Sequence, residues 1–156
     1  MNRILISYED PAMKEKAPRA LVKKVLNGTF RQLGCKDIEV SCSFVSDESI
    51  RSLNKQFRYI DESTDVLSFV SHDADEDVAF PGEEGEPNSL GDIVISLESL
   101  KNNAEYFSIQ FEEELCRVLI HGCLHLIGED HASNDPEEGM LRHQETLLNM
   151  LKGGQF

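Results

Sequence analysis

Four short apolar runs predict β-strands. Between residues 38 and 44 every second side chain is apolar and those between are polar, a period of two that is typical of a half-buried strand. The other runs lie at residues 4–8, 66–70 and 93–95 and are rich in β-branched or other apolar residues. Because only one loop separates the last two runs, we expect them to form neighbouring strands.

Apolar residues spaced three to four apart predict helices between and after these strands. The first helix begins near Pro18 and is ended by Gly34, a residue that readily adopts the left-handed conformation. The second is capped by Ser46 or Asp47, and Ser96 caps the third. The apolar stripe expected for the second helix is Ile50, Leu53 and Phe57.

Two longer helices are expected near the C-terminus. One is capped by Ser108, runs from about Ile109 to Ile127 and is stopped by Gly128. The other begins at a capping box in which Asp135 is the cap, Pro136 follows it and Glu138 lies three residues on. This order of elements predicts an α+β fold, in which a small mixed sheet of about four strands packs with about five helices.

Composition favours one soluble domain over the whole chain, residues 1–156, since 40% of the residues are hydrophobic and 28% are charged. The longest charge-free stretch, 118–128, is shorter than the roughly 18 residues that a transmembrane helix needs. The N-terminus has no apolar run of the secretory type. We therefore expect a cytoplasmic protein without a membrane partner. Reduced thiols in the core are expected for Cys35, Cys42, Cys116 and Cys123, which form no CxxC pair.

Charge is distributed unevenly along the chain. The formal net charge of −14 disfavours a polyanionic partner, but residues 1–60 carry +4 and residues 61–156 carry −18. A nucleic-acid surface should therefore use the first sixty residues, with Lys23, Lys24, Arg51 and Lys55 as candidates. Residues 71–90 contain seven Asp or Glu and neither Lys nor Arg, and they are expected to form an acidic flexible loop.

Three of the five histidines lie within eleven residues, at 121, 125 and 131. Side chains four apart on a helix are separated by about 40° around its axis, so His121 and His125 can reach one ion. Gly128 lets the chain leave the helix and return His131 as a third ligand. Three imidazoles with one open position are typical of catalytic rather than structural zinc. The expected metal site therefore lies on a long helix and the loop after it.

The spacing of these histidines also occurs in metzincin peptidases, which need Glu directly after the first His as a general base. Gly122 occupies that position here. Glycine has no side chain that could take a proton, so peptide hydrolysis by the usual zincin route is disfavoured.

Residues 121–131 match every fixed position of His-Gly-x-Leu-His-Leu-x-Gly-x-Asp-His, and the chain thereby resembles the YbeY family of metal-dependent endoribonucleases. The resemblance extends over residues 38–150. Its further blocks are Asn54 and Arg58 ahead of Thr64-Asp65-Val66-Leu67-Ser68-Phe69, and then Gly91-Asp92-Ile93. Two positions depart from the family pattern: Glu129 stands where an aromatic residue is common, and Val70 replaces a usual proline.

The resemblance implies one zinc ion per chain, bound by His121, His125 and His131, and catalytic roles for His121 and Arg58. It also implies a single-strand-specific endoribonuclease that acts in maturation of the 16S rRNA 3' end and in late quality control of the small ribosomal subunit. The implied partners are single-stranded RNA, ribosomal RNA, the small subunit, one of its proteins and an assembly GTPase. Without the resemblance, Arg58 would be interpreted as a solvated cation at a helix end. Its planar guanidinium nevertheless matches the geometry of a phosphate.

Several alternatives remain open from the residues alone. The protein could be a non-catalytic zinc-containing factor in ribosome assembly, or a metallohydrolase with another substrate. Asp65 either caps a backbone turn or orients a ligand imidazole, and Glu114 either accepts from a ligand imidazole or favours the dipole of its helix. His72 and His143 are expected to be surface residues.

Overall fold

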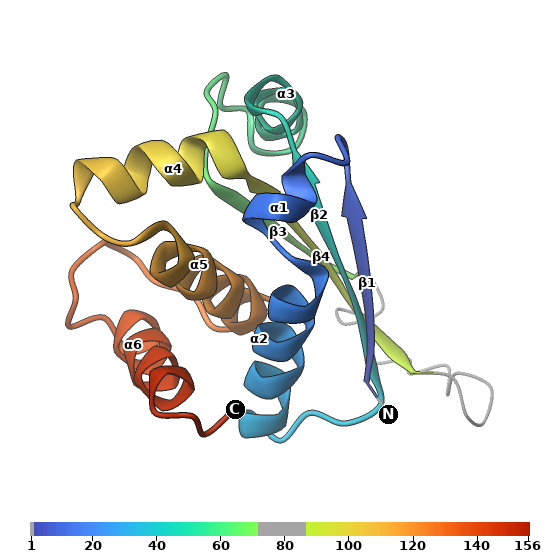
Figure 1. The fold of residues 1–156 in the computed structure, drawn as a ribbon, viewed down its shortest axis with the longest axis vertical. Coiled ribbons are helices and arrows are strands. Elements are labelled where there is room, and N and C mark those ends of the chain that lie inside the picture. The colour runs from blue at the N-terminus through green and yellow to red at the C-terminus, as the bar shows by residue number, and fades with distance from the viewer. Residues whose placement is uncertain (1, 72–86) are drawn as a thin grey trace.

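The computed structural model describes residues 2–71 and 87–156 and shows an α+β fold (Figure 1). Its elements are β1 (Arg3–Tyr8), α1 (Met13–Lys16), α2 (Arg19–Gln32), β2 (Ile38–Val45), α3 (Asp47–Arg58), β3 (Val66–Val70), β4 (Asn88–Ser96), α4 (Leu97–Tyr106), α5 (Phe111–Leu126) and α6 (Gly139–Lys152). The order agrees with the expected one apart from α1. That helix is only four residues long, too short to give a periodic pattern.

The strands form one mixed sheet in the order β1-β2-β4-β3. Strands β1, β2 and β4 are parallel, whereas β3 runs antiparallel to β4 with Val66 opposite Ile95. The two strands that flank the acidic segment are therefore neighbours, as expected. Strand β3 is an edge strand, so one side of its backbone is not paired in the sheet.

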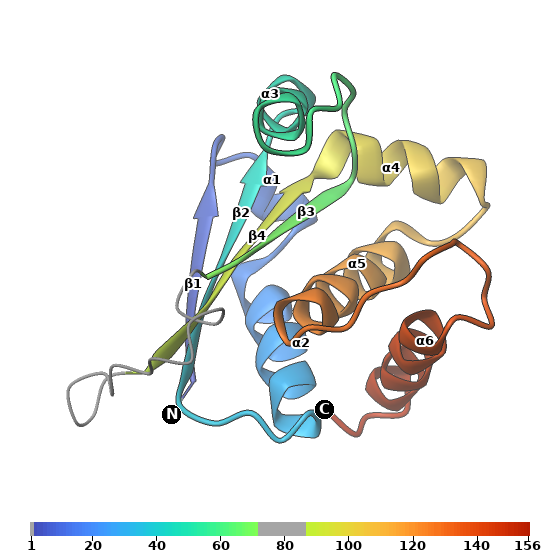
Figure 2. The same ribbon diagram turned by 180° about the vertical axis from the view of Figure 1, so that it is seen from behind.

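Helices α2, α5 and α6 lie together on one side of the sheet (Figures 1 and 2). The main core lies between them and the sheet, and α5 contributes Leu119 and Ile120, which are fully buried. Helix α5 approaches β4 closely at Gly122, because a Cβ atom there would lie 2.9 Å from Cδ1 of Ile93. The central helix that carries two of the candidate ligands is thus held firmly against the sheet.

Helix α3 packs on the opposite face of the sheet. Side chains alternate along a strand, so Leu67 and Val94 face away from α5 and form a second cluster with Ile50 of α3. The expected stripe of α3 is correct at Ile50 but wrong at Phe57, which remains 52% exposed. Its ring contacts that of Phe69 on β3.

Some helix ends differ from the prediction because local hydrogen bonds form separate turns. Ser46 and Ser96 cap α3 and α4 as expected. Ser108 does not cap α5; its φ is 54° and the helix begins three residues later. Asp135 does not begin α6 either, because its carbonyl accepts from the Glu138 amide in a turn that precedes the helix.

The expected loop 71–90 ends too late, because β4 begins at Asn88. The strand extends beyond its apolar residues by pairing Asn88 and Ser89 with β2, and sequence hydrophobicity does not report such pairing. Residues 72–86 of that segment, and with them the expectation for His72, fall outside the described residues.

The four cysteines are free thiols, as expected. Cys42 and Cys123 are fully buried, and their burial raises their pKa values. In the described ranges, no helix combines the length and apolar character needed to cross a membrane.

Candidate metal centre

His121 and His125 lie one turn apart on α5 and face each other. Their ring centroids are 4.6 Å apart, and the two Nε2 atoms are separated by 3.0 Å. The helical spacing thus brings two imidazole nitrogens to one point at the C-terminal end of α5.

His131 returns to the same point from the loop that follows α5. Gly128, two residues beyond the end of α5, has a φ of +97°, a left-handed conformation that glycine adopts without steric cost. The ring centroid of His131 lies 5.3 Å from that of His121 and 5.6 Å from that of His125. The sequence-based expectation that the loop would bring the three rings together is therefore met.

The three rings fit the coordination requirements of a metal ion. One nitrogen from each histidine lies within 4.8 Å of the other two. Zinc–nitrogen bonds of about 2.0–2.1 Å in a tetrahedral site place the nitrogens about 3.3 Å apart, close to the spacing of the His121 and His125 Nε2 atoms. Among the described residues, no Cys, Asp or Glu belongs to the group. This donor set could hold one metal ion and leave a coordination position for another ligand.

Two hydrogen bonds fix the orientation of the candidate ligands. Nδ1 of His121 lies 2.7 Å from Oε1 of Gln144, and Nδ1 of His131 lies 2.8 Å from the carbonyl oxygen of Ser133. Because both partners are acceptors, each Nδ1–H donates and each Nε2 lone pair is left free for a metal.

Gln144 was not identified from the sequence. It lies on α6, is 6% exposed and packs on the face that carries Met140, Leu147 and Leu148. The sequence did contain a signal for it, because Gln144 is a polar residue at helical spacing within an otherwise apolar stripe. A buried amide needs hydrogen-bond partners, and the ring of His121 supplies one.

Burial keeps the paired imidazoles neutral. It is the largest cause that lowers the pKa of His121; the hydrogen bond that His121 donates to Gln144 raises this pKa, and the neighbouring His131 lowers it. Burial likewise lowers the pKa of His125, with a further contribution from His121. Only the neutral ring can bind a metal, so this environment preserves the ligand form.

Asp65 fits neither of its two alternatives, whereas Glu114 lies in the first turn of α5, where a negative charge favours the helix dipole as one of its alternatives stated. The Asp65 carboxylate accepts from the side-chain amide of Asn103 at 3.2 Å, so it neither caps a turn nor touches an imidazole. Glu114 is 8% exposed and pairs with Arg117 at 3.1 Å. Its carboxylate is therefore used within α5, although helical spacing places it on the same side as His121.

The rings of His121 and His125 line a cleft of about 480 Å³. Its other lining residues are Arg58, Val66, Leu67, Ser68, Val70, Gly128, Glu129 and Asp130. Arg58 comes from the last turn of α3, and its Nη2 donates to the Ser68 carbonyl at 2.7 Å. It is the single Lys or Arg among the described residues of this cleft, which thus combines an arginine with two of the three candidate ligands.

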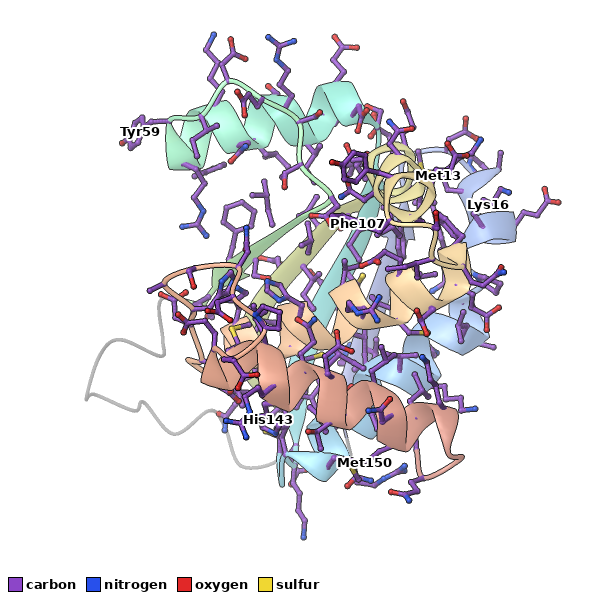
Figure 3. The ribbon with its side chains drawn as sticks, turned by 90° about the vertical axis from the view of Figure 1, so that its left-hand side faces the viewer. Met13, Lys16, Tyr59, Phe107, His143 and Met150 are labelled. Carbon is purple, nitrogen blue, oxygen red and sulfur yellow. The ribbon has the colours of Figure 1, made fainter. Side chains whose placement is uncertain are left out.

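Acidic groups at the cleft have partners of their own. Oε2 of Glu129 lies 2.8 Å from Nδ1 of His143, and Oδ1 of Asp130 accepts from the His131 backbone amide at 2.8 Å. His143, labelled on α6 in Figure 3, is a partly exposed surface residue as expected, and its side chain is paired with Glu129. Its position next to Glu129 depends on the loop after α5, which the sequence pattern could not place.

The basic residues proposed to follow RNA do not gather at this cleft. Arg51 and Lys55 both pair with Asp61, at 2.9 and 3.9 Å. Lys24 lines a different hollow, beside Glu112 and Glu113 in the first turn of α5. These surface cations lie near carboxylates, so the simple division of charge along the chain does not mark the site.

Comparison with known proteins gives a consistent result. Residues 4–152 match the family model described as "Endoribonuclease YbeY". The chain is 43% identical to the curated Endoribonuclease YbeY of Treponema denticola, over 97% of this chain and 94% of that protein. It is 38% identical to that of Caldanaerobacter subterraneus, covering 95% and 96%. A solution structure from Thermotoga maritima superposes with a TM-score of 0.62 at 30% identity, covering 97% of this chain and 90% of the other.

Proposed function

Because this chain belongs to the YbeY family of endoribonucleases, we propose that it is a zinc-dependent endoribonuclease that cleaves single-stranded RNA during ribosomal RNA maturation. The observation that carries this proposal is the convergence of three imidazoles at one point, two of which line a cleft that also holds Arg58. A Lewis acid and a group that stabilises negative charge on the phosphate both accelerate phosphodiester hydrolysis, and the site provides residues for both.

The proposed ligands of the single zinc ion are His121, His125 and His131. When bound, zinc supplies Lewis acidity that polarises a phosphoryl oxygen and makes a coordinated water more acidic. His121 has a second task through its Nδ1–H, since the hydrogen bond to Gln144 holds its ring in the ligand orientation.

Arg58 is proposed to bind the scissile phosphate. Its guanidinium is held by the Ser68 carbonyl through Nη2 and lies over the ring of Phe69, 5.5 Å from the centroid. A guanidinium has five N–H donors in a planar fork, so those not used by Ser68 remain available for phosphate oxygens. Arg58 can thereby place the phosphate next to the histidine cluster and offset charge that develops in the transition state.

The structure gives two reasons why a peptide is a poorer substrate. A side chain at position 122 would collide with Ile93, so the glutamate base of zincins does not fit there. The Ser68 carbonyl belongs to β3 and is already engaged by Arg58. An extended peptide that adds to a sheet edge needs such backbone groups to be free.

The cellular setting is proposed from the family. It comprises maturation of the 16S rRNA 3' end and late quality control of the small ribosomal subunit in the cytoplasm. Ribosomal RNA, the small subunit, one of its proteins and an assembly GTPase are the partners, and residues 1–156 act as one domain. The acidic surface of residues 61–156 outside the metal cleft is suited to face a basic protein rather than RNA.

Cleavage of a labelled single-stranded RNA by the purified protein, with zinc and after chelation, tests the activity. We expect cleavage by the wild type and its loss in His121→Ala, in Arg58→Ala and on chelation. The matched control is Arg31→Ala, which removes an exposed arginine of α2 that does not line the cleft. Equal cleavage by all variants would indicate a contaminating nuclease. Zinc binding without any cleavage would favour the alternative of a non-catalytic assembly factor.

A further inference from the structure

A second hollow, of about 780 Å³, lies on the α3 face of the sheet beside the metal cleft. Arg58, Ser68 and Val70 line both hollows. These residues belong to the edge strand β3 and to the last turn of α3, so the two hollows meet at the free edge of the sheet. A chain that leaves the metal cleft can therefore pass around the free edge of β3 and enter the second hollow.

An exposed aromatic pair forms one wall of this second hollow, which we call the α3 groove. The rings of Phe57 and Phe69 are in edge contact, with centroids 5.3 Å apart and planes at 66°. Helical spacing places Phe57 on the same face of α3 as Ile50. Ile50 is buried, whereas Phe57 is 52% exposed. An exposed apolar surface next to a cleft is typical of a binding site.

The composition of the α3 groove favours an uncharged planar ligand over a phosphate. Arg58 is the single Lys or Arg among its described lining residues, and it is shared with the metal cleft. Asp92, opposite Phe69 in the β3–β4 register, adds a carboxylate that repels phosphate. A carboxylate accepts from the amino group of a base, and aromatic rings stack on bases of any sequence.

We propose that the α3 groove binds one unpaired nucleobase of the RNA, next to the phosphodiester that Arg58 holds at the metal centre. Phe57 supplies the stacking surface, and the Asp92 carboxylate accepts from a base amino group. This inference rests on the proposed function and adds to it a base subsite with named residues. It also gives a physical reason for a preference for single strands, because a base in a duplex has both faces stacked and its pairing edge occupied.

The inference predicts an energetic coupling between one side chain and one base. The test uses two short RNAs with a single cleavable linkage, one complete and one with an abasic nucleotide next to that linkage. In the wild type, loss of the base should lower kcat/KM by roughly tenfold, the scale of base–aromatic stacking. In Phe57→Ala the complete RNA should lose the same factor, and the abasic RNA should lose nothing further. Placing the abasic nucleotide on either side of the linkage in turn identifies which neighbour is bound.

Two variants serve as controls for this cycle. Phe57→Trp retains an exposed ring and should retain the coupling. Phe107→Ala removes an aromatic residue that is 62% exposed just after α4 and belongs to neither hollow (Figure 3). It should leave both RNAs unaffected. Asp92→Asn should reduce the preference for bases that carry an amino group, while stacking of any base on Phe57 persists.

The outcomes separate this inference from the proposed function. One outcome is that the wild type cleaves RNA and that Phe57→Ala has the same kcat/KM values as the wild type for the complete and the abasic RNA. In that case the base subsite is wrong and the nuclease proposal stands. If the wild type cleaves neither RNA, the nuclease proposal fails. The subsite is then decided by fluorescence anisotropy of the same RNAs, in which Phe57→Ala should weaken binding of the complete RNA alone. Equal binding of both RNAs by the wild type and the variant would overturn it.

Discussion

The hydrogen bond between Gln144 and His121 offers a sensitive test of how the ligand set is positioned. Gln144→Leu removes the acceptor and leaves a side chain of similar size in the buried site. In the metal-bound form the proton of His121 must remain on Nδ1, because Nε2 binds the metal. That N–H then has no partner in the variant, at a contact that is 2.7 Å long in the wild type.

The expected loss can be estimated in two ways. An unsatisfied buried donor costs about 1–3 kcal/mol. Loss of the partner that orients a ligand lowers metal affinity by about 10–100-fold, or about 1.4–2.8 kcal/mol. In the metal-free protein the cost should be smaller, because His121 can move its proton to Nε2, which lies 3.0 Å from Nε2 of His125. The effect should thus appear in zinc affinity more than in stability.

A competition titration against a chromophoric zinc chelator measures the affinity, and urea unfolding of the metal-free protein measures the stability. Gln144→Glu keeps an acceptor and should retain zinc affinity. Asn149→Leu, at an exposed position of the same helix, controls for the change from amide to leucine. Unchanged zinc affinity in Gln144→Leu would show that the hydrogen bond to Gln144 does not position His121, as would an equal loss in Asn149→Leu.

Three further predictions concern the cleft and the helix that carries it. Arg58→Lys should lose most of the cleavage activity while zinc affinity stays unchanged, because a point charge cannot replace the planar fork; steady-state kinetics and the zinc titration check this, and full activity would contradict it. Gly122→Ala should destabilise the fold by about 1–3 kcal/mol in urea unfolding, because the added Cβ meets Ile93 at 2.9 Å; unchanged stability would show that the two elements separate easily. The lowered pKa values of His121 and His125 imply that the metal-free protein takes up protons on unfolding. The stability of the metal-free protein should therefore fall as the pH drops below about 6.5, the ordinary pKa of imidazole. A series of urea midpoints measured at different pH values checks this. The same pH dependence in His121→Ala as in the wild type would contradict it.

Periodicity predicted the strands and most helices well because burial determines them. The alternation at residues 38–44 appears as β2, and the spacing of His121 and His125 gave their common face directly. The errors occur where hydrogen bonds of local polar groups determine the backbone conformation. The side chain of Asp135 could cap a helix, but it forms a turn ahead of α6 instead. No pattern in the sequence distinguishes a helix cap from such a turn.

The candidate site could be predicted only as far as its residues are close in the chain. The role of His131 could be predicted because Gly128 implied that the chain reverses its direction near the end of the helix. Gln144, Ser68 and Phe57 act through contacts between elements whose relative placement depends on the whole sheet. Arg58 was recognised through the resemblance, since an exposed arginine at a helix end has no distinctive pattern of its own.

X-ray absorption spectroscopy of the zinc-loaded protein can establish whether three imidazoles hold one metal ion and leave a coordination position open. We expect one zinc per chain with three imidazole nitrogens and one further light atom at about 2.0–2.1 Å. Sulfur scattering at about 2.3 Å, or zinc bound equally well by His131→Ala, would contradict it.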